Sequence, residues 1–493
     1  MKKTFINFNI LAIILISILA ISIPQKTFQN DTYYYIKIGE SITRNNIDMK
    51  DHYSWVGNLD YSYPHWLFDV ITYKIHSNFG FEGLYIFNIL CALIIGLSVY
   101  FIGSHLTKNR LFSLIVALTT IVGLESFLAV RSQNISYILF IFEFLFIEKF
   151  LEKKDYRYII GLLAISTLLV NVHVAVWPAY FILFMPSIAE YIIYKFKDKI
   201  NIKKIGLDPY KFNIERCENA KYFIILMFLS LLTGFLTPTG ITPFTYIFKT
   251  MQGNSTGSIV EHLPIVLANS NFIFVAMMLF FGLLIFSKAK IKVRDFFLIA
   301  GLFYMTLMSK RHSALLISIG SIAFIRYISA FIKENDPCGS DNLIKLATKP
   351  FTALIIISIT ALACYPSFNQ RLNEEYHNEF FAPISATKYI KTHYDINNIK
   401  LYNNYADGAY LLYNDILVFQ DSRCDLYTKE FNKGINVFFD GEDIYTDYKK
   451  IFKKYDFDVI LENKASTFIK ELKYNKKYKK VYEDRLRVIY EKV

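Results

Sequence analysis

Cysteine and charged residues are scarce in this sequence of 493 residues, and each shortage excludes a class of protein. No two of the five cysteines have the spacing of a disulfide or of zinc ligands, which argues against a redox or structural zinc role. Charged residues make up only 19% of the chain, against 54% hydrophobic residues, and the mean hydropathy is +0.30. A single soluble domain has a smaller apolar share. The chain is therefore predicted to be a multi-span membrane protein.

The net charge of +12 does not indicate nucleic-acid binding, because of where the charge lies. The outer loop 24–81 and the tail 366–493 are both close to neutral. The excess lies in loops that the positive-inside rule assigns to the cytoplasm, with the amino terminus inside and the tail outside. These loops hold 23 Lys and Arg against 11 Asp and Glu, in segments 1–4, 104–110, 148–158, 195–221, 287–295 and 332–350.

Long apolar runs predict an α-helical polytopic membrane protein with about eleven transmembrane helices. The first run, from Phe5 to Ile23, also fits a cleaved signal peptide, but its length favours a retained span. The predicted spans are 5–23, 82–103, 111–128, 133–150, 156–172, 174–194, 222–237, 269–286, 295–309, 311–331 and 350–365.

Two domains are predicted: a transmembrane bundle over 1–365, which includes the outer loop 24–81, and a small extracytoplasmic α/β domain over 366–493. In the tail, short β-prone runs alternate with helical patterns, as in α/β domains. The predicted strands are 399–402, 416–419, 457–461 and 487–490, and the predicted helices are 384–393, 444–455 and 466–474. The sequence contains no repeat, no Gly-rich phosphate loop and no Ser-His-Asp spacing.

The outer loop 24–81 carries the strongest candidates for chemistry. A helix capped at Asn30 or Asp31 is predicted about seven residues after the first span, which places Asp31 near the bilayer surface. A second helix is predicted just after Pro64, with His65 and Asp69 four residues apart on one face. Asp31 alone is also compatible with a helix N-cap.

The order of several short motifs resembles bacterial membrane proteins related to the GT-C glycosyltransferases. Asp407 and its neighbours also resemble, distantly, the Trp-Trp-Asp-Tyr-Gly element of oligosaccharyltransferase catalytic subunits, which helps to bind the acceptor. The motifs that carry the resemblance are Asp31-x-Tyr-Tyr-Tyr-Ile-x-x-Gly-Glu-x-Ile, Asp51-His-Tyr-Ser-Trp55, His65-Trp-Leu-x-Asp69, Arg131-Ser-Gln133, Asn171-Val-His173, Glu261-His-Leu-Pro264, Asp407-Gly-Ala-Tyr410 and Phe419-Gln-Asp421-Ser-Arg423.

This resemblance implies a GT-C-like fold and a sugar donor linked to polyprenyl phosphate. It implies that Asp31 is the acidic catalytic residue of the first outer loop. No Asp-x-Asp motif follows the first span, so dependence on a divalent cation, magnesium or manganese, stays open, with Asp31 and Glu125 as its candidate ligands. Candidates for the substrate cavity are Asp51, His65, Asp69, His173 and Asp407.

Charged residues predicted at the outer membrane surface supply further candidates, because such groups near hydrocarbon are costly and often functional. Glu125 is assigned a catalytic role, and Arg131, Lys310 and Arg311 are assigned to the donor phosphate. A structural Glu125–Arg131 pair is the alternative for the first two. For Lys310 and Arg311, the alternative is that 295–331 does not cross the membrane twice.

Several other polar residues allow structural readings. His173 could form an interhelical hydrogen bond, and Asp407 with Gly408 could form a turn. Asp421, Arg423 and Asp425, at the end of a predicted strand, suit a ligand-facing rim, and a surface ion pair is the equal alternative.

The sequence thus predicts a membrane glycosyltransferase that passes a sugar from a polyprenyl-phosphate donor to an extracytoplasmic acceptor. A lipid or polysaccharide flippase and a non-catalytic envelope assembly protein are the alternatives. A flippase has no obvious use for an outer tail of about 128 residues, whereas an assembly protein would tolerate Asp31→Ala.

Overall fold

The computed structural model describes residues 5–196, 211–253, 257, 259–266 and 271–493. The chain forms two compact units. The helical unit comprises Met1–Gln25, Ile86–Leu236 and Ile259–Asn373, and the α/β unit comprises Lys26–Tyr85, Thr237–Ser258 and Glu374–Val493. The first outer loop thus groups with the tail. Most of the loop 195–221, which is predicted to be cytoplasmic, lies outside the described residues.

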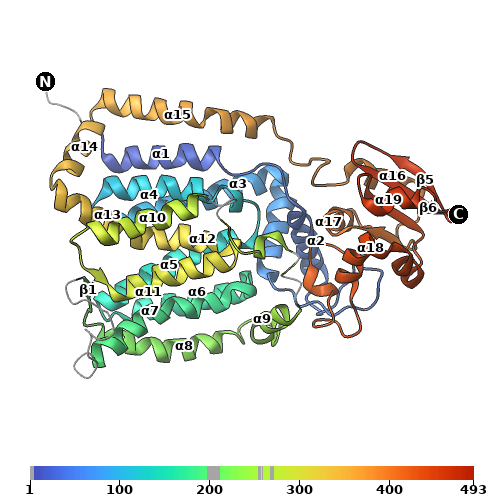
Figure 1. Cartoon of the computed structure of the whole chain (residues 1–493), viewed down its shortest axis with the longest axis horizontal. Helices are drawn as coiled ribbons and strands as arrows, with labels where there is room; N and C mark the ends of the chain where they lie inside the picture. Colours follow the sequence, from blue (N-terminus) through green and yellow to red (C-terminus); the bar gives the residue numbers. More distant parts are fainter. Residues whose placement is uncertain (1–4, 197–210, 254–256, 258, 267–270) are drawn as a thin grey trace. The chain divides into compact units, whose positions relative to one another are not determined.

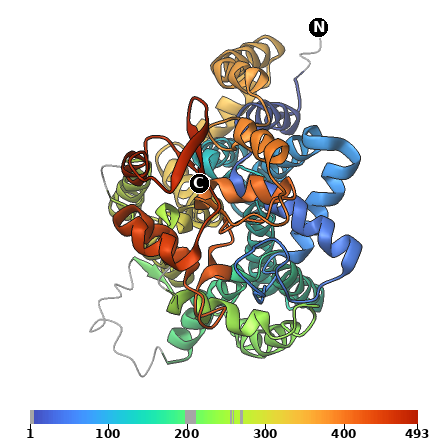
Figure 2. The same cartoon turned by 90° about the vertical axis from the view of Figure 1, so that its right-hand side faces the viewer.

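The helical unit is built from long apolar helices, several of which lie side by side in Figure 1 and are seen nearly end-on in Figure 2. Helix α1 packs against α4 and α15, and α7 packs against α11. The elements of this unit are α1 (Phe8–Ser22), α4 (Arg110–Gly123), α5 (Ser132–Glu152), α6 (Tyr156–Val172), α7 (Trp177–Phe196), α8 (Lys221–Thr233), α10 (Asn271–Phe286), α11 (Val293–Met308), α12 (Ser313–Leu315), α13 (Ser321–Asn335), α14 (Gly339–Ala347), α15 (Pro350–Asn373) and the two-residue strands β1 (Phe212–Asn213) and β2 (Ile291–Lys292).

Polar residues begin several of these helices by accepting hydrogen bonds from backbone N–H groups that the helix itself leaves unpaired. Asn7 accepts from Asn9 at α1, Asn109 from Phe112 at α4, and Asp155 from Arg157 at α6. Each of these caps lies within two residues of a predicted span start, so the predicted starts are close to the observed ones.

The prediction of eleven spans is not confirmed as a count. Among the described residues, four helical stretches have the length and composition to cross a membrane, and further apolar helices are shorter. The four are Trp66–Thr107, Val174–Phe196, Lys310–Asn335 and Pro350–Asn373. The last continues past 365, so the predicted domain boundary falls inside α15.

Helix α3 (Trp66–Thr107) joins the predicted helix after Pro64 to the predicted span 82–103. The two parts meet at Gly80, whose φ of 64° lies in the left-handed region that favours glycine. The sequence therefore predicted both parts, and the structure makes them one kinked element.

The α/β unit contains a four-stranded sheet of order β3-β4-β6-β5, in which β3 and β4 are parallel and the other pairs antiparallel. Tyr402 is level with Ile460 in the first pair, and Ile460 with Tyr490 in the second. The elements are α2 (Asn30–Asn45), α9 (Thr242–Gln252), α16 (Ile384–His393), β3 (Leu401–Asn403), α17 (Tyr405–Tyr413), α18 (Val437–Tyr455), β4 (Val459–Asn463), α19 (Thr467–Leu472), β5 (Tyr478–Glu483) and β6 (Arg487–Lys492).

The run 416–419 is not a strand of this sheet, contrary to its β-prone sequence. Its backbone bonds instead to the segment after Asp51: the N–H of Val418 donates to the carbonyl of Tyr53 at 2.9 Å. The N–H of Phe419 donates to the side chain of Asn403 at 2.9 Å. These bonds take the place of a strand partner. The prediction of a small α/β domain in the tail is confirmed, although its strands are not all the predicted ones.

Candidate functional site

Asp31 lies in the first turn of α2, in the α/β unit. The N-cap of α2 is Gln29, so the prediction that Asn30 or Asp31 caps this helix is wrong. A carboxylate in the first helical turn is stabilised by the helix dipole. Burial first, and then the charges of neighbours that include Asp31, raise the pKa of Tyr34 well above its usual value. Asp31 and Tyr34 therefore belong to one electrostatic environment.

Tyr34, His65 and Asp69 form a chain of side-chain contacts in the α/β unit. The Tyr34 hydroxyl lies 3.3 Å from Nε2 of His65, and Nδ1 of His65 lies 3.2 Å from Oδ1 of Asp69. Asp69 is fully buried, and its Oδ2 has no hydrogen-bond partner among the described residues. A carboxylate that holds one imidazole nitrogen fixes the ring's orientation, which is how a histidine is prepared for proton transfer. The predicted His65–Asp69 pair thus forms.

Gly39 of the first motif permits this arrangement. A Cβ atom at this position would lie 2.0 Å from the carbonyl oxygen of Asp69, so α2 can approach the start of α3 this closely only with glycine. The motif therefore fixes backbone packing as well as chemistry.

Asp51 lies in a buried ion-pair cluster. Arg423 donates to Oδ1 of Asp51 at 2.6 Å and, through two nitrogens, to Asp421 at 2.9 and 2.7 Å. Tyr427 donates to Asp421 at 2.6 Å. Against the effect of burial, Arg423 lowers the pKa of Asp421. The predicted surface ion pair of Asp421 and Arg423 is instead fully buried, and Asp51 is a structural partner of it.

Asp407 lies in the first turn of α17, so the reading of Asp407 and Gly408 as a turn is wrong. Arg487 donates to Asp407 from Nε at 3.1 and 3.0 Å and from a terminal nitrogen at 2.6 Å. A Cβ at Gly408 would lie 2.0 Å from the carbonyl oxygen of Gln420, which explains the glycine. A cavity of about 480 Å³ borders this pair and is lined by Gln29, Asn30, Phe380, Asn404 and Asn463 as well.

In the helical unit, Arg131 and Arg311 both contact a 3₁₀ turn over Val260–His262. Arg131 donates to Glu261 at 2.7 Å. Arg311 lies 3.4 Å from Nε2 of His262 and 3.3 Å from Nε2 of His173. Two of the three residues that were predicted to bind the donor phosphate therefore contact the same turn.

The imidazole of His262 beside Arg311 is set up as a neutral partner. Burial, and then the charge of Arg311, lowers the pKa of His262 to about 4. His173 lies 3.0 Å from the hydroxyl of Ser136 on α5, so the expected interhelical hydrogen bond is present. Sequence reasoning did not assign a role to Glu261 or His262, although both stand in a motif of the resemblance.

The other predicted residues of this unit have different surroundings. Glu125 is half exposed and accepts from Arg371 at 3.2 Å, so the alternative Glu125–Arg131 pair does not form. Lys310 is exposed at the start of a 3₁₀ turn between α11 and α12. Glu143 is fully buried in α5, and neither carboxylate oxygen has a hydrogen-bond partner among the described residues.

An apolar groove of about 300 Å³ lies in the helical unit between α4, α10, α11 and α13. Ile115, Phe272, Phe303 and Phe324 line it, together with Leu316, which follows Arg311 by five positions. The apolar lining of this groove is complementary to an acyl or prenyl chain.

One potential metal-ligand group occurs among the residues that the structure describes, formed by Glu190, Glu215 and Cys217. A guanidinium nitrogen of Arg294 lies 2.9, 2.7 and 3.2 Å from these three ligand atoms, so the group already holds a cation. Neither Asp31 nor Glu125 belongs to such a group within its own unit.

Comparison with solved structures identifies the fold. The oligosaccharyltransferase of Archaeoglobus fulgidus, solved with a tethered acceptor peptide, superposes with a TM-score of 0.58 at 9% identity over 92% of this chain and 69% of its own. ArnT of Cupriavidus metallidurans, solved with undecaprenyl phosphate, superposes with a TM-score of 0.56 at 10% identity over 99% of this chain and 97% of its own. The chain has the GT-C fold.

The GT-C fold confirms the resemblance inferred from the motifs, and both of these structural neighbours are membrane glycosyltransferases. No family model matches the sequence, and no curated protein matches it. At such low identity the likeness establishes the fold alone.

Proposed function

We propose that this protein is a membrane glycosyltransferase that transfers a sugar from a polyprenyl-phosphate-linked donor to an acceptor outside the cytoplasmic membrane. The observation that carries the proposal is the pair of guanidinium groups, Arg131 and Arg311, beside the turn that holds Glu261. Departure of a phosphate from the sugar builds negative charge on its oxygens, and preorganised cations stabilise that charge. Lys310, one residue away from Arg311, adds a third cation.

The apolar groove supports a lipid-linked donor. It is lined by residues of α13 and of the segment just after Arg311, so apolar and cationic surfaces follow each other along one stretch of chain. A polyprenyl phosphate has the same sequence of parts, an apolar chain and then a phosphate. ArnT, which shares the fold, was solved with such a lipid.

Asp31 is the proposed general base for the acceptor hydroxyl. It lies in the first turn of α2, at the positive end of the helix dipole. His65 is a second candidate, because buried Asp69 orients its ring and Tyr34 contacts the opposite nitrogen. A direct displacement by the activated hydroxyl inverts the anomeric carbon.

A divalent cation would add to the positive charge at the donor phosphate. Magnesium is typically held by one or two carboxylates together with substrate phosphates and water. Asp31 of the α/β unit or Glu125 of the helical unit would supply a carboxylate to it, and the cation would neutralise charge on the departing phosphate.

The proposed orientation places the amino terminus inside and the α/β unit outside. Single cysteines at the exposed positions Lys345 and Lys433 test it in intact cells with a membrane-impermeant thiol reagent. We expect labelling at 433 and none at 345. The reverse pattern would invert the topology and remove the outer placement of Arg311.

The decisive experiment follows sugar transfer from a radiolabelled polyprenyl-phosphate donor by purified protein in nanodiscs. Transfer that Asp31→Asn or Arg311→Ala abolishes supports the enzyme. Donor that crosses the bilayer unchanged identifies a flippase. A protein that neither transfers nor translocates any lipid-linked sugar, although it is needed for envelope assembly, is the non-catalytic alternative.

A further inference from the structure

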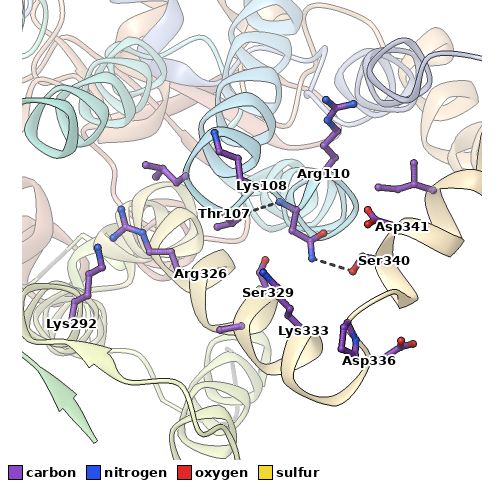
Figure 3. A pocket seen from close by; sticks show the side chains of 15 residues that line it. Thr107, Lys108, Arg110, Lys292, Arg326, Ser329, Lys333, Asp336, Ser340 and Asp341 are labelled. Atoms are coloured by element: carbon purple, nitrogen blue, oxygen red, sulfur yellow. Dashed lines mark hydrogen bonds between the residues drawn. The ribbon is translucent and has the colours of Figure 1, made fainter. Parts of the chain in front are cut away.

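A second polar cavity lies in the helical unit, away from the residues assigned to the donor. It measures about 470 Å³ and is bordered by the end of α3, the start of α4, strand β2, α13 and α14. Figure 3 shows its lining side chains. None of Arg131, Glu261, Lys310 or Arg311 is among them.

The cavity has a strong excess of positive charge. Its basic side chains are Lys108, Arg110, Lys292, Arg326 and Lys333, and its only acidic ones are Asp336 and Asp341. This composition predicts an anionic occupant.

Two of the five cations already have carboxylate partners outside the lining. Arg326 donates to Asp295 at 2.8 and 2.9 Å, and Lys292 lies 3.0 Å from Glu215.

The side chains of the other three cations, Lys108, Arg110 and Lys333, make no hydrogen bond or ion pair with any residue that the structure describes. All three are exposed. They are therefore available to a ligand from outside the protein.

The walls of the cavity are tied together. Asn109 donates to the hydroxyl of Ser340 on α14 at 3.1 Å, and its own oxygen caps α4 by accepting from Phe112 at 3.2 Å. The backbone of Lys108 is left-handed, with φ of 59°, at a position after a helix end where glycine is usual. A lysine thus occupies a left-handed backbone position beside the cavity.

Apolar surface adjoins the cavity. Helix α14 exposes Leu343 and Leu346, and the following helix α15 exposes Phe351 and Leu354. In addition, Lys108, Arg110 and Lys333 belong to segments that the positive-inside rule assigns to the inner surface. A cationic hollow beside exposed apolar helices matches an amphiphile with an anionic head and apolar tails.

We propose that this cavity binds the phosphate headgroup of an anionic phospholipid of the inner leaflet, with Lys108, Arg110 and Lys333 as its ligands. The site is separate from the proposed donor site and does not depend on the proposed transferase activity.

The test is native mass spectrometry of the full-length protein with phosphatidylglycerol or with neutral phosphatidylcholine. The variant Lys108→Asn/Arg110→Gln/Lys333→Gln removes the three charges, and asparagine tolerates the left-handed backbone at 108. Lys153→Gln/Lys345→Gln/Lys349→Gln is the matched control, because these lysines are exposed, are predicted to lie on the same side and do not line the cavity. Lys333→Gln alone is a milder second variant.

We expect the cavity variant to bind phosphatidylglycerol about 150-fold more weakly, given roughly 1 kcal/mol for each of the three basic residues near an anionic membrane surface. Lys333→Gln should lose about fivefold, and the control should keep nearly all of the wild-type affinity.

Unchanged binding in the cavity variant, or equal losses in the variant and the control, would overturn the site. Displacement of phosphatidylglycerol by excess inorganic phosphate would overturn the lipid as the source of the anion.

Discussion

Arg423 and Asp51 are 372 positions apart in the sequence and form a buried ion pair of 2.6 Å. Asp421 completes the pairing of the same guanidinium, so all three side chains depend on one another. The pair fastens the first outer loop to the carboxy-terminal part of the α/β unit.

The first prediction concerns this pair. Asp51→Asn should destabilise the α/β unit by roughly 3–5 kcal/mol, because it leaves a buried guanidinium with an incomplete set of counter-charges. Thermal unfolding of the purified protein measures the effect. Asp60→Asn is the control, since the Lys50–Asp60 pair is exposed and such pairs contribute about 0–1 kcal/mol. Equal shifts in both variants would contradict the structural role of Asp51.

Asp31→Asn should reduce sugar transfer by about 10²–10⁴-fold, as expected for loss of a general base. The fold should be nearly unchanged, because asparagine keeps the shape of the side chain and Gln29 remains the N-cap. The measurement is turnover of a lipid-linked sugar, beside Asp443→Asn as an exposed control. Wild-type turnover in Asp31→Asn would leave Asp31 with a structural role only.

His65→Gln and Asp69→Asn separate the second candidate base from the residue that orients it. If His65 transfers the proton, His65→Gln should lose about 10²–10⁴-fold in kcat. Asp69→Asn should lose less in kcat, with little change in KM, because the imidazole remains but is held less well. If only KM changes in both variants, these residues bind substrate and Asp31 is the base.

Arg311→Lys should impair turnover more than its conserved charge suggests, because an ammonium cannot bind two phosphate oxygens as a guanidinium does. Turnover should fall more than donor affinity if the contact strengthens as the phosphate leaves. Lys310→Ala is expected to be milder, since Lys310 is exposed. If donor affinity and turnover are unchanged in Arg311→Lys, Arg311→Ala and Lys310→Ala, the phosphate role passes to Arg131.

Glu462 makes the stability of the α/β unit depend on pH. Burial raises its pKa to about 7, so between roughly pH 4.5 and 7 the folded state binds more protons than the unfolded state. Stability should therefore fall as pH rises through this window and then level off. Glu462→Gln should abolish this dependence and stabilise the protein at pH 8 by about 2–4 kcal/mol. A wild-type melting temperature that does not change over this range would refute the burial effect.

The sequence predicted elements whose signal is local and missed those that depend on distant partners. Helix α16 begins and ends where its pattern predicts, and Pro64 correctly marked the approach to α3. Strand β5 was missed because Lys479 and Lys480 obscure its alternation, and only pairing with β6 makes it a strand.

The same limit applies to the candidate site. The His65–Asp69 contact follows from helical spacing, so it could be predicted. The partners of Arg131 and Arg311 could not, because Glu261 and His262 come from a segment far along the chain.

Helix α15 has a consequence for handling the protein. Only 6% of its apolar window is buried inside the protein, although it packs along α1. Lateral pressure and hydrophobic thickness of the surrounding lipid therefore determine where this helix rests. Detergent exchange removes that support, so α15 should be the first helix to detach during solubilisation, and its detachment would break the contact of Arg371 with Glu125.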